Sequence, residues 1–240
     1  YMCVNYTHRS MRPVQHIKLA VDAVVFSYQQ QKLHVLLVQQ KYGIMKGKWV
    51  LVGGFVKDEE SLSDAVKREL AEEAGVKVDY MEQLYTFGDD VGRDPRFRVV
   101  SVAYFSIVNP KGFKLKADSD ASDAQWFAID ELPDLGYDHK IILRAAQQRL
   151  SAKLSYQPIG FDLLPKEFAF SELEHLYSTL LDKTIDRRNF RKKILSFGFI
   201  EETGKMQAAA TGRPAKLFRF NKQKYHQLVK DGFHFDVSLL

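Results

Sequence analysis

The chain has 240 residues and a formal net charge of +5, and 45% of its residues are apolar. This length suits two domains, with enough apolar side chains for packed cores. Cys3 is the only cysteine, which excludes an intrachain disulfide and predicts a reducing, cytoplasmic compartment, and no segment approaches the ~18 consecutive apolar residues of a membrane span.

Residues 1–15 are expected to form a flexible N-terminus, and they contain no apolar run typical of a secretion signal. Residues 16–155 predict a mixed domain of strands and helices. Two β-rich runs separated by three glutamines indicate a strand pair joined by a turn, and a helical pattern follows a Gly-Gly turn. The predicted strands are 16–28, 34–40, 49–52, 83–87, 98–108 and 124–129, and the predicted helices are 61–74 and 139–154.

The segment 54–76 places three carboxylates on one face of its predicted helix. Glu69, Glu72 and Glu73 lie at i, i+3 and i+4, and like charges at this spacing destabilise a bare helix by roughly 0.2–0.5 kcal/mol per pair. A hard divalent cation such as Mg²⁺, bridging to a substrate phosphate, would offset the repulsion. The alternative interpretation is a solvated acidic face.

The same segment resembles the signature of the Nudix hydrolases. The residues that fill the signature are Gly54, Glu60, Arg68, Glu69, Leu70, Glu72, Glu73, Gly75 and Val76. The resemblance implies that Glu69, Glu72 and Glu73 bind a metal and that one of them activates water. It implies that Glu60 pairs with Arg68, so that all five residues belong to the catalytic site. The same resemblance implies an α/β/α sandwich. It also implies that the reaction is the hydrolysis of a nucleoside diphosphate linked to another group.

A polar turn before the strand 98–108 contains two candidate ligand-binding arginines. Arg93 and Arg96 can hold phosphate or ribose hydroxyls by bidentate hydrogen bonds. The segment 92–96 resembles one in Nudix domains that handle ADP-ribose, and it also occurs in sugar-sensing relatives. A turn held by ion pairs to neighbouring aspartates is the alternative. With the Gly-Gly turn included, the candidate ligand-binding residues are Gly53, Gly54, Arg93 and Arg96.

The positive charge of the chain is confined to its last third. Residues 1–164 contain 21 Lys+Arg and 21 Asp+Glu, whereas residues 165–240 contain 14 and 9. This asymmetry is typical of a nucleic-acid-binding module beside a neutral partner. Residues 156–240 predict helices at 170–181 and 186–197, capped by Ser171 and Asp186, and strands at 199–203 and 217–220. The order indicates a winged helix-turn-helix domain.

The second helix of this domain is strongly basic. Its apolar residues can pack while its basic side meets phosphates or base edges. Arg213, between a glycine and a proline, predicts a wing that follows the DNA backbone or enters the minor groove. A solvated basic helix and a plain hairpin turn are the alternatives. The candidate DNA-binding residues are Arg187, Arg188, Asn189, Arg191, Lys192, Lys193, Arg213 and Lys216.

The two modules in this order, with Gly-Arg-Pro-Ala at 212–215, resemble the Nudix-related transcriptional regulators of bacteria. The resemblance covers about residues 16–235 and implies an α+β protein, a Nudix α/β/α sandwich followed by a winged helix-turn-helix. Members repress genes of NAD metabolism in response to ADP-ribose or related nucleotides, and some relatives sense pentoses. They are typically dimers on palindromic double-stranded operators. Many members carry degraded signatures, whereas this signature is complete, which leaves hydrolysis open.

Three functions therefore compete. We favour a repressor that binds operator DNA and whose Nudix domain senses, and can hydrolyse, a nucleotide such as ADP-ribose. The second is a repressor responsive to arabinose or xylose, with a non-catalytic Nudix domain. The third is a Mg²⁺-dependent ADP-ribose pyrophosphatase whose basic C-terminal module serves dimerisation or contacts RNA.

Overall fold

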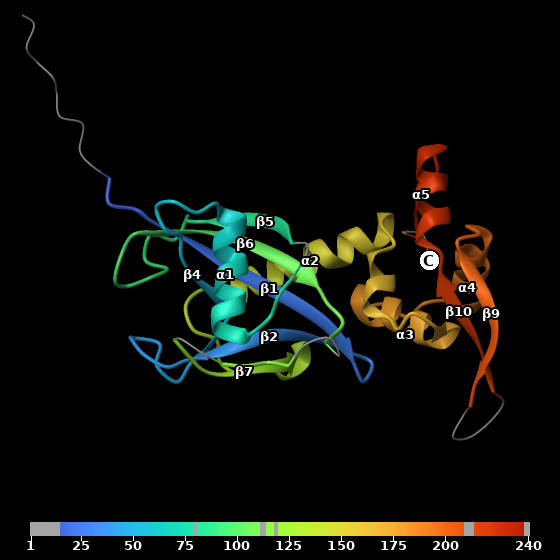
Figure 1. Ribbon diagram of the computed structural model, residues 1–240, viewed down its shortest axis with the longest axis horizontal. Coiled ribbons are helices and arrows are strands. Elements are labelled where there is room, and N and C mark those ends of the chain that lie inside the picture. The colour runs from blue at the N-terminus through green and yellow to red at the C-terminus, as the bar shows by residue number, and fades with distance from the viewer. Residues whose placement is uncertain (1–14, 79–80, 111–113, 118–119, 209–213, 238–240) are drawn as a thin grey trace, which may run out of the picture.

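The computed structural model describes residues 15–78, 81–110, 114–117, 120–208 and 214–237, and it forms the two domains seen in Figure 1. Apart from Gln15, the N-terminus predicted to be flexible lies outside these ranges. None of the helices within the described ranges is long and apolar enough to cross a membrane.

The N-terminal domain is built on a seven-stranded sheet. Its strands are β1 (Lys18–Gln29), β2 (Lys32–Gln40), β3 (Trp49–Val50), β4 (Val52–Phe55), β5 (Glu82–Phe87), β6 (Val99–Ile107) and β7 (Ala121–Ala128). β1 is central, because one of its edges pairs in parallel with β6 and the other pairs antiparallel with β4 and then with β2. β2 also pairs with β3 and β7, and β6 pairs with β5.

Helices cover both faces of this sheet, α1 (Leu62–Ala74) on one face and α2 (His139–Tyr156) on the other. Successive side chains of a strand point to opposite faces. Val21 and Val25 of β1 accordingly pack in the cluster that contains α1, whereas Val24 and Phe26 pack in the cluster that contains α2. The predicted α/β/α sandwich is therefore present. A single 3₁₀ turn, η2 (Ile129–Glu131), follows β7.

The C-terminal domain has the helix-turn-helix and hairpin of a winged helix. Its elements are β8 (Phe168–Ala169), α3 (Phe170–Leu181), α4 (Arg187–Ser196), β9 (Ile200–Gln207), β10 (Ala215–Phe220) and α5 (Lys222–Lys230). The strands form an antiparallel sheet in the order β8-β10-β9. β8 and α5 were not among the predicted elements.

One predicted helix cap in this domain is confirmed and the other is wrong. Asp186 precedes α4 and accepts from the backbone N–H of Arg188 at 3.0 Å, as predicted. Ser171 does not cap α3. The cap position is Ala169, whose backbone N–H donates to Oε2 of Glu172 at 2.8 Å, because β8 runs directly into the helix.

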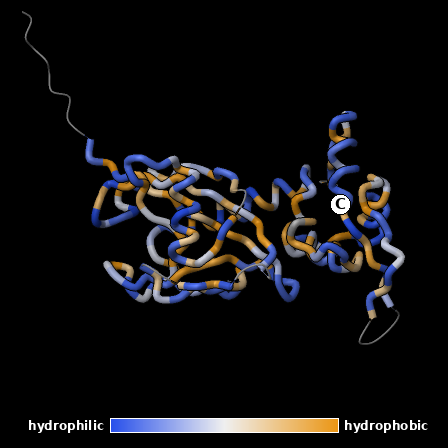
Figure 2. Tube along the Cα trace, in the orientation of Figure 1, coloured by the Kyte–Doolittle hydropathy of each residue, from blue (hydrophilic) through white to orange (hydrophobic). Residues whose placement is uncertain are grey.

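A continuous apolar core joins the two domains. Leu150 and Leu154, in the last turns of α2, belong to the same cluster as Leu176 of α3 and Phe199 after α4. Figure 2 shows apolar segments in the interior of both domains. A 3₁₀ turn, η3 (Ile159–Leu163), connects α2 to the winged helix. The predicted boundary between residues 155 and 156 falls at the end of α2 and stays a prediction.

Candidate functional site

The acidic helix α1 begins and ends as its sequence directs. Ser61 is the N-cap, and its Oγ accepts from the backbone N–H of Asp64 at 3.1 Å. Gly75 has a φ of 66°, the left-handed conformation in which glycine ends helices at least cost. These local signals fix which residues of α1 face the sheet, so Glu69 and Glu73 are buried and Glu72 is exposed.

The Gly-Gly turn brings the backbone of β4 very close to its neighbours. A Cβ on Gly53 would lie 2.3 Å from the backbone oxygen of Val21, and a Cβ on Gly54 would lie 2.3 Å from Oε1 of Glu69. Neither distance is possible for a real side chain, so both positions require glycine or a local displacement. The backbone N–H of Gly53 donates to Oε2 of Glu73 at 3.2 Å. The turn thus brings its backbone against the carboxylates of α1.

Arg68 organises the loop before α1. Its Nε and Nη2 donate to the two carboxylate oxygens of Glu60 at 2.9 and 2.7 Å, a bidentate pair. Its Nη1 donates to Glu69 at 2.7 Å and to Glu72 at 3.1 Å, and its Nη2 also donates to the backbone oxygen of Phe55 at 3.2 Å. Hydrogen bonds from Arg68 lower the pKa of Glu60 to about 2.

The two buried carboxylates of α1 hold protons more tightly than usual. Burial raises the pKa of Glu73 to about 8, and the nearby carboxylates of Glu69, Asp120 and Asp22 act in the same direction. Burial also raises the pKa of Glu69, against the opposing effect of Arg68. The free-energy cost of burying these carboxylates close together falls when they bind a cation or a proton.

A divalent cation fits the donor chemistry of this cluster. The side chains supply hard carboxylate oxygens, the ligands that divalent cations such as Mg²⁺ prefer, and Glu69 and Glu73 both line the cavity. In the described part of the chain, no group of three or more Asp, Glu, His or Cys side chains is arranged to hold a metal ion. Glu69 and Glu72 turn instead toward Arg68. Binding a cation therefore requires new rotamers of these side chains.

Arg93 is not held by the adjacent aspartates that sequence reasoning considered. Its Nε and Nη2 donate to the two oxygens of Asp138 at 2.9 and 2.7 Å, and its Nη2 lies 3.5 Å from Oδ2 of Asp22. Burial works against its charge, but Asp138 and Asp22 outweigh this, and the pKa of Arg93 is raised. Both partners were missed, because they are distant in sequence.

Asp22 is the buried centre of this polar network. It accepts from Oγ of Ser101 at 2.5 Å, and its Oδ1 lies 3.3 Å from Nε2 of His139. Burial raises the pKa of Asp22, but His139, Ser101 and Arg93 outweigh it, so the pKa is lowered. Nδ1 of His139 accepts from the backbone N–H of Leu51 at 2.8 Å, which assigns the hydrogen to Nε2. A single aspartate inside the apolar run of β1 was the available sequence signal.

Arg96 has a local partner, as the alternative interpretation expected. Its Nε and Nη2 donate to Asp94 at 3.1 and 2.8 Å, and its Nη2 donates to the hydroxyl of Tyr137 at 3.1 Å. Its guanidinium also lies 5.9 to 6.0 Å from the rings of Phe55, Phe97 and Tyr137. Arg96 is therefore framed by aromatic rings and remains partly exposed.

These residues enclose a cavity of about 230 Å³. Gly53, Gly54, Arg93 and Arg96 all line it, so the four candidate ligand-binding residues lie together. Glu69 and Glu73 line it as well, whereas Glu60, Arg68 and Glu72 do not. The acidic and imidazole side chains of the lining that sequence reasoning did not place in the site are Asp22, Asp94, Asp120 and His139.

The basic residues of α4 fall into two groups. Arg187, Arg188 and Lys192 are exposed, and within the described residues no ion pair joins them. Arg191 is exposed as well, but its guanidinium lies 4.4 Å from the centre of the Phe170 ring. The other two basic-helix candidates also have local contacts: Nδ2 of Asn189 donates to Asp186 at 3.0 Å, and Nζ of Lys193 lies 5.8 Å from the ring of Phe197.

The structure describes the two strands of the wing, β9 and β10, on either side of residues 209–213. Lys216 of β10 forms an ion pair with Glu202 of β9 at 2.5 Å and is exposed. Arg213, the predicted groove-contacting residue, lies outside the described residues. The hairpin carries further basic side chains, since Lys205 pairs with Glu167 and Arg219 pairs with Glu201. Neither was predicted to contact DNA.

Comparisons with known proteins agree with both halves of this description. Residues 16–146 match the family described as NUDIX domain, and residues 160–220 match the NrtR DNA-binding winged helix domain. The chain is 32% identical over 211 residues to the ADPR responsive transcriptional repressor NtrR of Acinetobacter baylyi, covering 86% of this chain and 83% of that protein.

Solved structures match the same two-domain arrangement. Shewanella oneidensis NrtR complexed with a 27mer DNA superposes with a TM-score of 0.72 at 33% identity, covering 87% of this chain and 95% of that one. The NUDIX domain of the same protein complexed with ADP ribose superposes with a TM-score of 0.52 at 35% identity, covering 61% and 94%. The chain therefore belongs to the NrtR family of Nudix-related transcriptional regulators, which combine a Nudix domain with a winged helix DNA-binding domain.

Proposed function

We propose that this protein is a cytoplasmic repressor that binds a palindromic operator as a homodimer and releases it when the Nudix domain binds ADP-ribose or a related nucleotide. The observation that carries the proposal is a cavity lined by two arginines in a domain that shares its apolar core with a winged helix. The names of the relatives support both the nucleotide effector and the DNA, since one relative is an ADPR responsive repressor and another was solved with DNA.

The cavity lining favours a phosphorylated ligand over a neutral pentose. Arginine pairs with phosphate by two parallel hydrogen bonds, and a pentose offers no anion for Arg93 and Arg96. The lining also holds five carboxylates, namely Asp22, Glu69, Glu73, Asp94 and Asp120. A diphosphate would be repelled by them, so we propose that a divalent cation, Mg²⁺ by preference for phosphate oxygens, accompanies it. We assign that cation to Glu69 and Glu73, because both line the cavity and supply carboxylate oxygens.

The experiment measures binding of the full-length protein to a labelled duplex from its own promoter region by fluorescence anisotropy. We expect specific, salt-dependent binding that ADP-ribose weakens in the presence of Mg²⁺. Arabinose and xylose are tested in parallel. A response to a pentose and none to ADP-ribose would establish the sugar-responsive alternative. Unchanged operator affinity after Arg188→Ala and Lys192→Ala together would contradict the assigned DNA-binding face.

Hydrolysis of the bound nucleotide is a second function that the same cavity supports. The specific observation is that Glu69 and Glu73 of the complete signature line the same cavity as Arg93 and Arg96, the proposed phosphate-binding residues. When bound, the metal neutralises charge on the phosphates and lowers the pKa of water. Release of AMP from ADP-ribose with Mg²⁺, lost in Glu73→Gln, would support this activity. Equal rates for the variant and the wild type would exclude it.

A further inference from the structure

The helix α2 begins in the wall of the ligand cavity. Tyr137 and His139 both line the cavity, and Asp138 between them precedes the first turn of α2. The backbone oxygen of Asp138 accepts from the N–H of Ile141 at 2.8 Å, so the position of Asp138 sets the start of the helix. The first turn of α2 is thus part of the site where the proposed effector binds.

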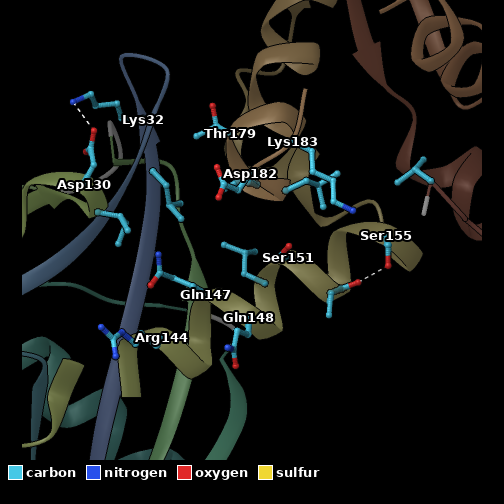
Figure 3. A pocket seen from close by; sticks show the side chains of 17 residues that line it. Lys32, Asp130, Arg144, Gln147, Gln148, Ser151, Ser155, Thr179, Asp182 and Lys183 are labelled. Carbon is cyan, nitrogen blue, oxygen red and sulfur yellow. Dashed lines mark hydrogen bonds and ion pairs between the residues drawn. The ribbon is translucent and has the colours of Figure 1, made fainter. Parts of the chain in front are cut away.

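The far end of α2 belongs to the interface between the domains. Figure 3 shows its second half, with Gln147, Ser151 and Ser155, along one wall of a cleft of about 1020 Å³. The opposite wall carries Thr179, in the last turn of α3, and Lys183, which follows that helix. The apolar side of α2 packs in the core that includes α3. At its last turn, the backbone oxygen of Ser155 accepts from Val237 at 2.9 Å.

One helix of 18 residues, about 27 Å long, therefore spans from the cavity to the DNA-binding domain. Its hydrogen bonds run along the helix, so a displacement of its first turn is transmitted as a movement of a stiff element. The cleft beside its second half lies between α2 and the end of α3.

Arg93 is one of the side chains that hold the cavity end of α2 in place, beside His139, which accepts from the backbone N–H of Leu51. The fork of Arg93 makes two hydrogen bonds to Asp138, and its side chain is only 5% exposed, although it lines the cavity. The same fork geometry binds phosphate. A phosphate group in the cavity and the carboxylate of Asp138 are thus alternative partners for the same donors.

We propose that effector binding is communicated to the winged helix by a partner exchange at Arg93, in which a phosphate of the ligand takes the guanidinium from Asp138 and releases the first turn of α2. This inference rests on the proposed function and adds the route by which the cavity acts on DNA binding. It assigns Asp138 a coupling role, because Asp138 directly precedes the first turn of α2 and does not line the cavity. It also requires an anionic effector, since a neutral sugar cannot replace a carboxylate at Arg93.

The test compares Asp138→Asn with Asp134→Asn in the full-length protein. Asp134 precedes the same helix and forms an ion pair with Lys48 at 2.5 Å, but it is exposed and does not line the cavity. For each protein, the operator dissociation constant is measured with and without saturating ADP-ribose and Mg²⁺, and ADP-ribose binding is measured by calorimetry. The readout is the operator dissociation constant with ADP-ribose and Mg²⁺ divided by the constant without them.

We expect a ratio of about 5 to 150 for the wild type and for Asp134→Asn, the usual range of coupling between two sites. In Asp138→Asn the ratio should fall to within about twofold of one. Because Arg93 no longer has to leave a carboxylate, the affinity of the Asp138→Asn protein for ADP-ribose should be equal to that of the wild type or higher. A wild-type ratio in Asp138→Asn, or loss of its ADP-ribose binding, would overturn the exchange.

Hydrogen exchange on the unmodified protein gives a second test that needs no variant. ADP-ribose should accelerate exchange of the amides of Ile141 and Ile142, which donate to the backbone oxygen of Asp138, while it slows exchange around the Gly-Gly turn. Slower or unchanged exchange at both isoleucines, with slowing at the turn, would overturn the inference and leave the proposed function intact. Wild-type protein that binds no ADP-ribose would overturn both.

Discussion

The guanidinium of Arg191 lies over the ring of Phe170, 4.4 Å from its centre, and the ring of Phe218 lies 5.3 Å from the same group. Arg191 thus joins α4 to the start of α3 and to β10. The neighbouring Arg188 is exposed on the same helix and makes no such contact in the described residues. Two arginines three positions apart in one basic helix therefore have different physical roles.

Replacing Arg191 should weaken the winged helix itself. A cation over an aromatic ring contributes about 0.5–2 kcal/mol, and the side chain also covers apolar surface. We expect Arg191→Ala to lower the free energy of unfolding by about 1 kcal/mol, measured by thermal and denaturant unfolding. Arg188→Ala should leave it unchanged within about 0.5 kcal/mol. Equal losses in the two variants would contradict the assignment.

Replacing Arg188 should reduce the electrostatic part of DNA binding. Each phosphate contact contributes about 0.9 to the slope of log K against log salt concentration. We expect Arg188→Ala to lower this slope by about one unit and to weaken binding to operator and non-operator duplexes alike. Titrations at four salt concentrations measure it. A change confined to one operator base pair would indicate that Arg188 reads a base instead.

Glu73 should make the protein less stable at alkaline pH. Its pKa is about 8 in the fold and ordinary, near 4.5, in the unfolded chain, so the folded state holds the extra proton between these values. Stability contributed by the neutral form is complete below about pH 4.5 and is lost as the pH rises through 8. The maximum loss is about 5 kcal/mol, at about 1.4 kcal/mol per pKa unit.

The measurement compares thermal unfolding at pH 5.5 and pH 8.5 in the absence of divalent cations. The wild type should unfold at a lower temperature at pH 8.5, and Glu73→Gln should remove most of this difference. Mg²⁺ should restore stability at pH 8.5 in the wild type, because the cation replaces the proton. A pH dependence that survives unchanged in Glu73→Gln would place its origin elsewhere.

The two glycines of the turn should tolerate substitution differently. A Cβ on Gly53 meets the backbone oxygen of Val21, which β1 holds in the sheet, whereas a Cβ on Gly54 meets the end of the Glu69 side chain. We expect Gly53→Ala to cost at least about 2 kcal/mol of stability. Gly54→Ala should cost less in stability but displace Glu69 and weaken Mg²⁺ and ADP-ribose binding. Unfolding and calorimetry of both variants separate these effects.

Local patterns were sufficient to predict α1, because its signals lie within the helix and its two ends. Ser61 and Gly75 mark its limits, but the spacing of the carboxylates did not separate the buried Glu69 and Glu73 from the exposed Glu72. The two-residue strand β8 could not be predicted, since it exists only where β10 offers a hydrogen-bonding edge. Helix α5 was detectable, because Asn221 is its N-cap and accepts from Lys224 at 2.9 Å.

In the candidate site too, local sequence predicted the residues of one helix but not the contacts between distant segments. Glu69 and Glu73 were found because their positions are fixed by one helix, whereas Arg93 was found without its partners. Asp138 lies 45 positions from Arg93, and Asp22 lies 71 positions from it. Contacts of this separation depend on how strands are ordered in the sheet, which a single sequence does not state. The stacking of Arg191 on Phe170 was missed for the same reason.

Asp22 lies where the sheet is least able to move. It pairs across one edge of β1 with Gly53 and across the other with Ala103, so its backbone is locked by hydrogen bonds on both sides. A ligand that enters the cavity therefore meets one stationary charge, whereas Arg93 lies in the loop between β5 and β6 and α2 begins outside the sheet. When a ligand binds, side chains outside the sheet can therefore move relative to Asp22, whereas Asp22 keeps its position in β1.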